Sequence, residues 1–177
     1  MSNPQEPSPA KLVIGLFMRE KNNLEEIALE LSAKFGRIDL ISAWMPFDYT
    51  TYYEQEMGRP LFRRVFAFEE FIQQSALATI KIATNAIEQI YSHTGRRSVN
   101  IDPGYLLQER FVLASGKNFS HRIYIGKGIY ADLTLVYSKG GFQKLPWTYP
   151  DYADKPMLGF LGQVRAKYVL QLKRGIA

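Results

Sequence analysis

Charged side chains and a histidine are concentrated in a segment whose remaining composition is that of two β-strands. The segment is KNFSHRIYIGKGIYADLTLVY, residues 117–137, and these residues are Lys117, His121, Arg122, Lys127 and Asp132. Lysine and arginine bind phosphate and carboxylate oxygens, and a histidine can transfer a proton near neutral pH. The candidate catalytic residues are therefore His121 and Lys117, and Arg122 is a candidate ligand-binding residue.

The turn Gly126-Lys127-Gly128 predicts a β-hairpin with one polar and one apolar face. A three-residue loop gives the cross-strand pairs Ile125–Ile129, Tyr124–Tyr130, Ile123–Ala131 and Arg122–Asp132. A two-residue loop would mix apolar and polar residues on each face, so the hydrophobic pattern favours the longer loop. Two interpretations of the polar face remain open: a solvated ion pair, and a ligand-binding surface that includes Tyr124 and Tyr130. By alternation His121 falls on the apolar face, where a lone histidine is usually a buried core residue.

Four carboxylates would suit a divalent cation if the fold brought them together. They are Asp102 in NIDPGY, Asp132 in the hairpin, and Glu54 and Glu56 in TTYYEQEMG. Carboxylate oxygens are the ligands that Mg²⁺ and Mn²⁺ prefer, so these are the candidate metal ligands and metals. An aspartate before Pro-Gly is also ordinary turn chemistry. The sequence does not show whether the four converge.

Two aromatic loops and one helix carry further candidates. TTYYEQEMG, residues 50–58, contains Tyr53 and is either a lid over a site or a surface loop whose tyrosines pack inward. PWTYPDY, residues 146–152, would stack on a base or sugar, or cover a sheet edge. Lys81, Asn85 and Glu88 lie at i, i+4 and i+7 of a predicted helix. A solvated polar stripe is the favoured interpretation there, and a ligand contact from Asn85 is the alternative.

Hydrophobic periodicity predicts the elements that position these residues. KLVIGLFM, residues 11–18, is a continuous apolar run typical of a strand buried on both faces. Residues 24–35 have helical spacing and 37–45 form a second strand, which together predict a βαβ unit with parallel strands. A strand over 61–68, a helix up to Tyr91, several antiparallel strands after Arg97 and a helix over 155–174 follow. The predicted class is α/β to α+β: a single mixed sheet with an N-terminal βαβ unit, C-terminal antiparallel strands and about three helices packed on the sheet.

Length and composition limit the class of protein. A chain of 177 residues fits one domain, expected over residues 11–177 after a disordered tail at residues 1–10. Cysteine is absent, which excludes disulfides and thiolate catalysis, and two histidines exclude a site with three histidine ligands. The sequence has neither an apolar run of membrane-spanning length nor a secretion signal, so we expect a cytoplasmic protein with no membrane association.

The distribution of charge favours an anionic partner. Residues 1–60 carry a net charge of −3, whereas residues 61–177 carry +8. A phosphate, a nucleotide or a nucleic acid would be attracted to such a basic region. The alternative is a protein that is simply basic, since lysine and arginine never occur more than two in succession.

Several stretches resemble the domain of unknown function 4416 family, a group of small uncharacterised proteins found mainly in bacteria. The stretches are TTYYEQEMG, IKIATNAIE, VNIDPGYL, FVLASGKNFSHRIYIGKGIYADLTLVY and WTYPDY, in this order over about residues 50–152. The resemblance implies no particular activity, because none is established for the family. It does imply that many relatives have glutamate where this sequence has Asp132, which would preserve a carboxylate.

These features predict a protein that binds a small anionic ligand, either phosphate-bearing or a nucleotide, with a divalent metal as a candidate companion. If it is an enzyme, metal-assisted phosphoryl or nucleotidyl transfer or hydrolysis would use such residues. The alternatives are a non-catalytic RNA- or protein-binding module and a structural subunit in which every charge is a solvated pair. The sequence leaves the ligand and the oligomeric state open.

Overall fold

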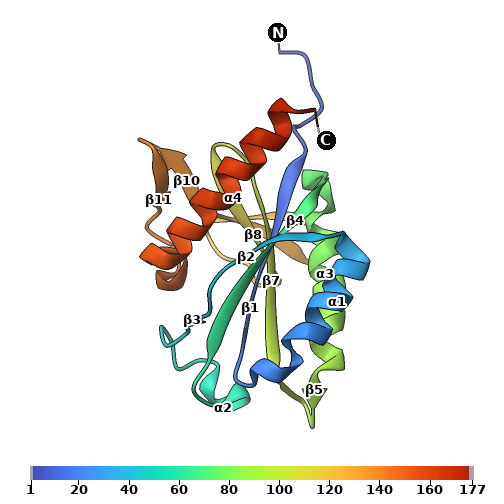
Figure 1. Ribbon diagram of the computed structural model, residues 1–177, viewed down its shortest axis with the longest axis vertical. Helices are drawn as coiled ribbons and strands as arrows, with labels where there is room; N and C mark the ends of the chain where they lie inside the picture. Colours follow the sequence, from blue (N-terminus) through green and yellow to red (C-terminus); the bar gives the residue numbers. More distant parts are fainter. Residues whose placement is uncertain (1, 176–177) are drawn as a thin grey trace.

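One large β-sheet with helices against both of its faces forms the body of the protein. The computed structural model describes residues 2–175 (Figure 1). Within them the main sheet has nine strands: β1 (Ala10–Met18), β2 (Ile38–Ile41), β3 (Met45–Pro46), β4 (Phe62–Ile72), β7 (Val99–Leu106), β8 (Arg110–Ser115), β9 (Arg122–Gly126), β10 (Ile129–Ser138) and β11 (Gly141–Lys144). A small second sheet joins β5 (Ser92–His93) and β6 (Arg96–Arg97). The α-helices are α1 (Leu24–Phe35), α2 (Glu54–Met57), α3 (Leu77–Ile90) and α4 (Lys155–Lys173).

The strand order confirms the predicted α+β class and refines the N-terminal unit. The order is β11-β10-β8-β7-β1-β4-β2, with β3 paired to β4 and β9 to β10, and every ladder in the described residues is antiparallel. Both β1 and β2 run antiparallel to β4, which lies between them. They therefore point the same way, as predicted, but they are not neighbours. The eleven-residue β4 takes the place beside β1, and the four-residue β2 is left at the edge.

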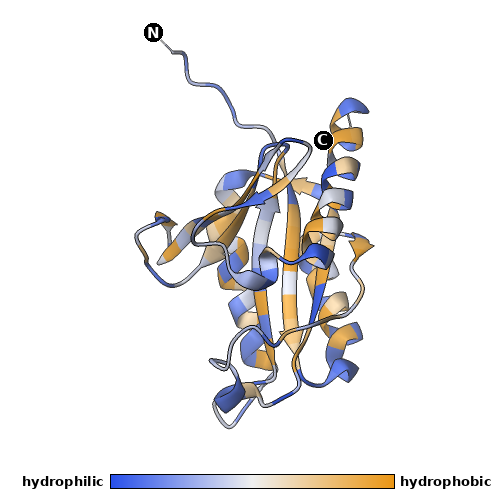
Figure 2. Cartoon of the chain, turned by 90° about the vertical axis from the view of Figure 1, so that its left-hand side faces the viewer, coloured by the Kyte–Doolittle hydropathy of each residue, from blue (hydrophilic) through white to orange (hydrophobic). Residues whose placement is uncertain are grey.

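The centre of the core is β1, all nine residues of which are buried. Leu12, Ile14 and Leu16 pack with α1 and α3 on one face of the sheet, whereas Val13 packs with α4 on the other. Figure 2 shows the long central strands as the most continuously hydrophobic part of the chain. Burying a leucine or isoleucine contributes roughly 1.5–3 kcal/mol, so this strand anchors both helix layers.

The predicted apolar faces of the helices are the faces that pack on the sheet. In α1, Ile27 and Leu31 are buried and their helical neighbours pack against the same cluster. In α4, Leu161, Val164 and Tyr168 are buried against the opposite face. The helix spacing of 3.6 residues thus correctly predicts which side of each helix meets the core.

The β9–β10 hairpin has most of the predicted register, but the exposure of its side chains does not follow the division into a polar and an apolar face. Tyr124–Tyr130, Ile123–Ala131 and Arg122–Asp132 are paired as predicted, but Ile129 pairs with Gly126 instead of Ile125 because the ladder is irregular there. The polar face is covered around Asp132, which is only 4% exposed, whereas Tyr124 on the same face and Ile123 on the other are 60% and 69% exposed. The chain after β11 folds back over β10, where Trp147 and Thr148 bond to the carbonyl oxygens of Leu133 and Thr134.

Candidate ligand-binding site

Strands β7 and β8 separate partway along their length. Their ladder covers only Gly104–Leu106 opposite Phe111–Leu113, and β8 continues beyond it as a partner of β10 alone. Extending the register would set Asp102 opposite Ser115 and Asn100 opposite Lys117. We call this region, residues 100–103 and 114–117, the strand divergence.

Polar side chains from several strands share one face of the sheet at the strand divergence. Residues paired directly across antiparallel strands have side chains on the same face. A continuous row of pairs joins Val13, Gly104, Leu113, Asp132 and Arg122. Asp102 lies two residues from Gly104 and therefore has the same orientation. Arg63 on β4 shares this orientation, because its partner Phe17 lies two residues from Gly15, the partner of Asp102. The predicted residues Asp102, Asp132 and Arg122 therefore lie on the face that α4 covers.

A chain of alternating acidic and basic side chains runs through the protein beside the strand divergence. Its members, in order of contact, are Glu56, Arg97, Glu88, Lys81, Asp102, Arg63 and Asp151. The outer Glu56–Arg97 contact is 2.7 Å and partly exposed, whereas Arg63, Lys81, Glu88 and Asp151 are buried. Buried charges are stable only when they are paired and hydrogen-bonded, and alternation provides each of them with a partner.

Helix α3 uses two of these charges to bond the free edge of β7. Lys81 Nζ donates to the carbonyl oxygen of Ile101 at 2.7 Å, and Glu88 Oε1 accepts from the backbone N–H of Ile101 at 2.6 Å. The favoured prediction of a solvated stripe is therefore wrong for Lys81 and Glu88, which are 8% and 6% exposed. The stripe is buried because the missing β8 partner leaves backbone groups that must be satisfied. Asn85, on the same helix, is partly buried.

Burial and neighbouring charges set the protonation of this cluster. Burial raises the pKa of Glu88 and of Asp151, and the adjacent Lys81 and Arg63 oppose that rise. Burial by itself would lower the pKa of Arg63, but Tyr152, Asp151 and Asp102 raise it overall. Burial likewise raises the pKa of Tyr53 and of Tyr152, so both phenols are neutral at physiological pH.

Asp102 differs from the other members of the chain because it is partly open and makes no close contact. Its side chain is 27% exposed, and its oxygens lie 3.7 Å from Lys81 Nζ and 3.8 Å from Arg63 Nη2. Both separations are too long for a hydrogen bond. Nearby, Tyr152 Oη, Arg63 Nε and Asn100 Nδ2 are buried polar atoms without a hydrogen-bond partner in the described residues. Atoms of this kind usually bond to water or to a ligand.

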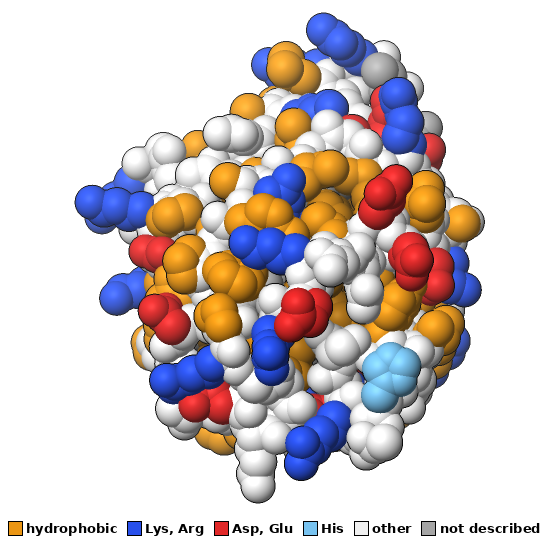
Figure 3. Space-filling model, turned by 60° about the horizontal axis from the view of Figure 1, so that its bottom comes forward, with side chains coloured by type: hydrophobic (Ala, Val, Ile, Leu, Met, Phe, Trp, Pro, Cys, Tyr) orange, Lys and Arg blue, Asp and Glu red, His pale blue; other side chains and the backbone are white. Residues whose placement is uncertain are grey.

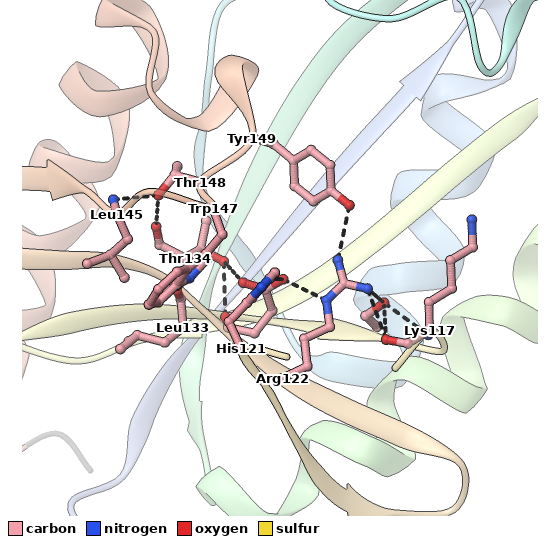
Figure 4. Close-up of polar contacts among 11 residues, drawn as sticks. Lys117, His121, Arg122, Leu133, Thr134, Leu145, Trp147, Thr148 and Tyr149 are labelled. Atoms are coloured by element: carbon pink, nitrogen blue, oxygen red, sulfur yellow. Dashed lines mark hydrogen bonds and ion pairs between the residues drawn. The ribbon is translucent and has the colours of Figure 1, made fainter. Parts of the chain in front are cut away.

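A second polar cluster lies on the other side of the strand divergence, centred on Arg122 (Figure 4). Arg122 Nε donates to Asp132 at 2.9 Å, and Nη2 donates to the Tyr149 hydroxyl at 3.0 Å. Its Nη1 donates to Ser115 Oγ at 3.0 Å and to the Lys117 carbonyl oxygen at 2.9 Å. The predicted Arg122–Asp132 pair is thus largely buried and ties β9, β10 and the end of β8 together.

His121 belongs to this cluster and not to the apolar core that alternation predicted. Its Nε2 lies 3.2 Å from Asp132 Oδ2, and its ring stacks on Trp147 at 5.1 Å with an interplanar angle of 11°. The prediction fails because His121 precedes β9, so strand alternation does not apply to it.

The amino group of Lys117 is held by a tyrosine instead of a carboxylate. Lys117 Nζ donates to the Tyr52 hydroxyl at 3.0 Å and lies 4.6 Å from the centre of the same ring. This hydrogen bond and the lysine charge lower the pKa of Tyr52. In Figure 4 the Lys117 side chain extends away from the Arg122 contacts. Its charge is therefore available near the surface.

The four carboxylates predicted as metal ligands are not brought together. Asp132 pairs with Arg122, Asp102 lies between Lys81 and Arg63, Glu54 pairs with Arg59, and Glu56 pairs with Arg97. Across residues 2–175 no group of three or more acidic or histidine side chains is arranged to hold a metal ion. Each of these carboxylates already faces a cation.

Both aromatic loops reach the strand divergence. From residues 50–58, Tyr52 contacts Lys117 and Tyr53 packs edge-on against Phe17 at 4.7 Å. From residues 146–152, Tyr149 contacts Arg122, and the short 3₁₀ helix Pro150–Tyr152 presents Asp151 to Arg63. Tyr124 and Tyr130 lie 5.4 Å apart on the hairpin, away from these contacts. The two loops thus supply four of the side chains around the site.

The sequence analysis did not single out Arg63, Arg97 or Asp151. Arg63 occupies a core-facing position in an otherwise apolar strand, and its guanidinium lies 4.7 Å from the Phe47 ring and 4.8 Å from the Tyr152 ring. An arginine whose alternation places it inside a sheet is a signal that could have identified it. Nothing local distinguishes Arg97 or Asp151 from surface charges.

The surface next to the site carries both signs of charge. An open depression of about 420 Å³ is lined by Tyr52, Gln55, Glu56 and Arg96. Figure 3 shows the face that includes α2 and β5, where basic and acidic side chains are interspersed. This face does not have the uniform positive charge expected of a surface that binds duplex nucleic acid.

The fold and the site define an α+β protein in which two neighbouring strands of an antiparallel sheet separate and buried charged side chains bond the strand edge that is left free. The chain belongs to the DUF4416 family, a domain of unknown function, whose model matches residues 8–168. No curated protein and no solved structure matches the chain. None of the described helices is long and apolar enough to cross a membrane.

Proposed function

We propose that this protein binds a small phosphate-bearing ligand at the strand divergence, with Lys117 and Arg122 as the cations that contact the phosphate and His121 beside them. The observation that carries the proposal is the Lys117 amino group, which faces a tyrosine hydroxyl and has no acidic partner in the described residues. The backbone carbonyl oxygen of Lys117 accepts a hydrogen bond from a second cation, Arg122, which is held in place by four hydrogen bonds. A lysine and an arginine on neighbouring segments suit a phosphate dianion.

Tyr52 and Tyr149 are the side chains that would cover such a ligand. Both are exposed, and each already bonds to one of the two cations. Any divalent metal would arrive with the ligand, because the carboxylates of the site are paired with lysine, arginine or histidine. A cytoplasmic location is part of this proposal, since phosphorylated metabolites are retained there.

The test measures the binding of inorganic phosphate, glycerol 3-phosphate and AMP, each with and without Mg²⁺, through the change in the thermal unfolding temperature of the protein. A ligand at about 100 times its Kd adds about 2.7 kcal/mol, which raises Tm by about 5–10 °C at this chain length. Lys117→Ala should weaken binding about tenfold or more, because a hydrogen bond to a charged group contributes about 1.5–3 kcal/mol. Lys144→Ala, at an exposed position on β11, is the matched control. Equal binding by both variants would contradict the proposal.

A second candidate is single-stranded RNA, which the exposed aromatic side chains favour. Phe119, Tyr52, Tyr149 and Trp147 are all exposed and lie in the same part of the fold as Lys117 and Arg122. Aromatic rings stack on bases while cations contact the backbone phosphates. Short mixed oligoribonucleotides should then bind more tightly than AMP, with an affinity that falls steeply as salt rises. Oligonucleotides that bind no better than AMP would exclude this candidate.

A further inference from the structure

We propose that Asp102 accepts a hydrogen bond from a hydroxyl group of the phosphate-bearing ligand, so that the ligand class is a phosphorylated polyol, sugar or nucleoside. This inference rests on the proposed function above and adds a second point of recognition. It is carried by the incomplete contacts of Asp102, which is partly exposed and lies between two buried cations at distances beyond hydrogen bonding.

The charges around Asp102 select a neutral donor over a second anion. Along the chain of charges that includes Asp102, four carboxylates, on Glu56, Glu88, Asp102 and Asp151, face three cations, on Arg97, Lys81 and Arg63. A phosphate or carboxylate placed here would be repelled by the excess negative charge. A hydroxyl carries no charge, can donate to Asp102, and can accept from Lys81 or Arg63.

Buried polar atoms without partners point to the same position. The Tyr152 hydroxyl is buried without a hydrogen-bond partner, and it lies 3.0 Å from the position that a Cβ on Gly15 would take. Gly15 is paired directly with Asp102. The amide nitrogen of Asn100 and Nε of Arg63, both buried, also lack partners. A ligand with more than one hydroxyl would supply the missing partners.

The spacing of the two recognition points fits a small phosphorylated molecule. If the β7–β8 register continued past Gly104, Asp102 would lie opposite Ser115, and Lys117 would lie two residues farther along β8. Paired strands lie about 5 Å apart and two residues span about 7 Å, so on strands that separate the two backbone positions are at least roughly 9 Å apart. A pentose or nucleoside monophosphate is long enough for side chains at both positions to reach it.

The experiment compares ligands that differ only in their hydroxyl groups. The probes are glycerol 3-phosphate against propyl phosphate, and AMP against 2′,3′-dideoxy-AMP, measured by calorimetry on the full chain. In at least one pair, the member that has the hydroxyl groups should bind at least about tenfold more tightly than the member that lacks them. In Asp102→Asn that difference should largely disappear while propyl phosphate binds as before. Asp48→Asn, at an exposed position, is the matched control and should retain the difference.

Two outcomes overturn the inference and separate it from the proposed function. If both members of each pair bind equally to the unaltered protein and Lys117→Ala weakens both, Asp102 has no such role while phosphate binding stands. If no phosphate-bearing probe binds, both proposals fail together. The comparison on the unaltered protein requires no variant, so a poorly folded Asp102→Asn would not prevent a decision.

Discussion

The carboxylate of Glu88 on α3 accepts the backbone N–H of Ile101 on β7 at 2.6 Å, in the place where a neighbouring strand would otherwise bond. Lys81 bonds the carbonyl oxygen of the same residue, so one helix satisfies both backbone groups. The backbone groups that the strand divergence leaves without a strand partner are therefore hydrogen-bonded at Ile101. The partly exposed carboxylate of Asp102 lies immediately beside it.

Glu88→Ala should lower the free energy of unfolding by about 3–5 kcal/mol, because it leaves Lys81 and the Ile101 N–H buried without this partner. Urea denaturation followed by circular dichroism would measure the loss. Gln89→Ala, one residue along the same helix and exposed, is the control and should change stability by about 0.5 kcal/mol or less. A Glu88→Ala protein as stable as the control would contradict the bonding described here.

The pH dependence of stability should reveal the environment of Glu88. Burial raises its pKa in the folded protein above the ordinary value of 4.5. As pH falls from neutrality through the raised pKa toward 4.5, the folded state binds a proton that the unfolded state does not yet bind, so folding is favoured. The unaltered protein should therefore gain stability relative to Glu88→Gln over that interval. Asp151 and the other acids titrate in both proteins, so their effects cancel in the difference, and a constant difference would argue against a raised pKa.

Gly15 and Tyr152 should be energetically coupled. A Cβ at position 15 would lie 3.0 Å from the Tyr152 hydroxyl, so Gly15→Ala forces the ring to move and should cost about 1–3 kcal/mol. Tyr152→Phe removes a hydroxyl that has no partner and should be nearly neutral. In the double variant the cost of Gly15→Ala should fall by at least about 0.5 kcal/mol. Additive effects in a thermal-unfolding cycle would show that the hydroxyl is not the limiting contact.

Tyr52 should titrate below the ordinary phenol value of 10, because its hydroxyl accepts a hydrogen bond from Lys117. The lysine charge favours the phenolate, so Lys117→Met should move the pKa of Tyr52 upward. Nuclear magnetic resonance of ¹³C-labelled tyrosine would follow the titration, with Tyr52→Phe to assign the signal. An unchanged pKa in Lys117→Met would place the lysine amino group elsewhere in solution.

The elements that sequence patterns predict correctly are those with strong local periodicity. The apolar run of β1 identifies a strand buried on both faces, and helical spacing identifies the core side of α1 and α4. Most of the hairpin register also follows from alternation around the glycine turn. In each case the pattern reflects which side of a single element meets apolar neighbours.

The parts that the sequence could not predict depend on distant segments. A polar stripe on α3 has the same pattern whether water or the free edge of β7 lies beside it, so Lys81 and Glu88 were assigned to solvent. The sequence left open whether the polar face of the hairpin meets solvent, because its cover comes from residues 146–152. Of the predicted site residues, His121, Arg122 and Asp132 meet in one cluster that Lys117 joins through its backbone carbonyl oxygen, while Asp102 belongs to another.

The position of β4 between β1 and β2 has a consequence for the order in which the protein can fold. A chain made from its amino terminus completes β1, α1 and β2 before the strand that both β1 and β2 require as a neighbour. Until Ile72 has been synthesised, β1 and β2 both lack the neighbour that they share. The pairing of both amino-terminal strands therefore depends on a strand that is made after them.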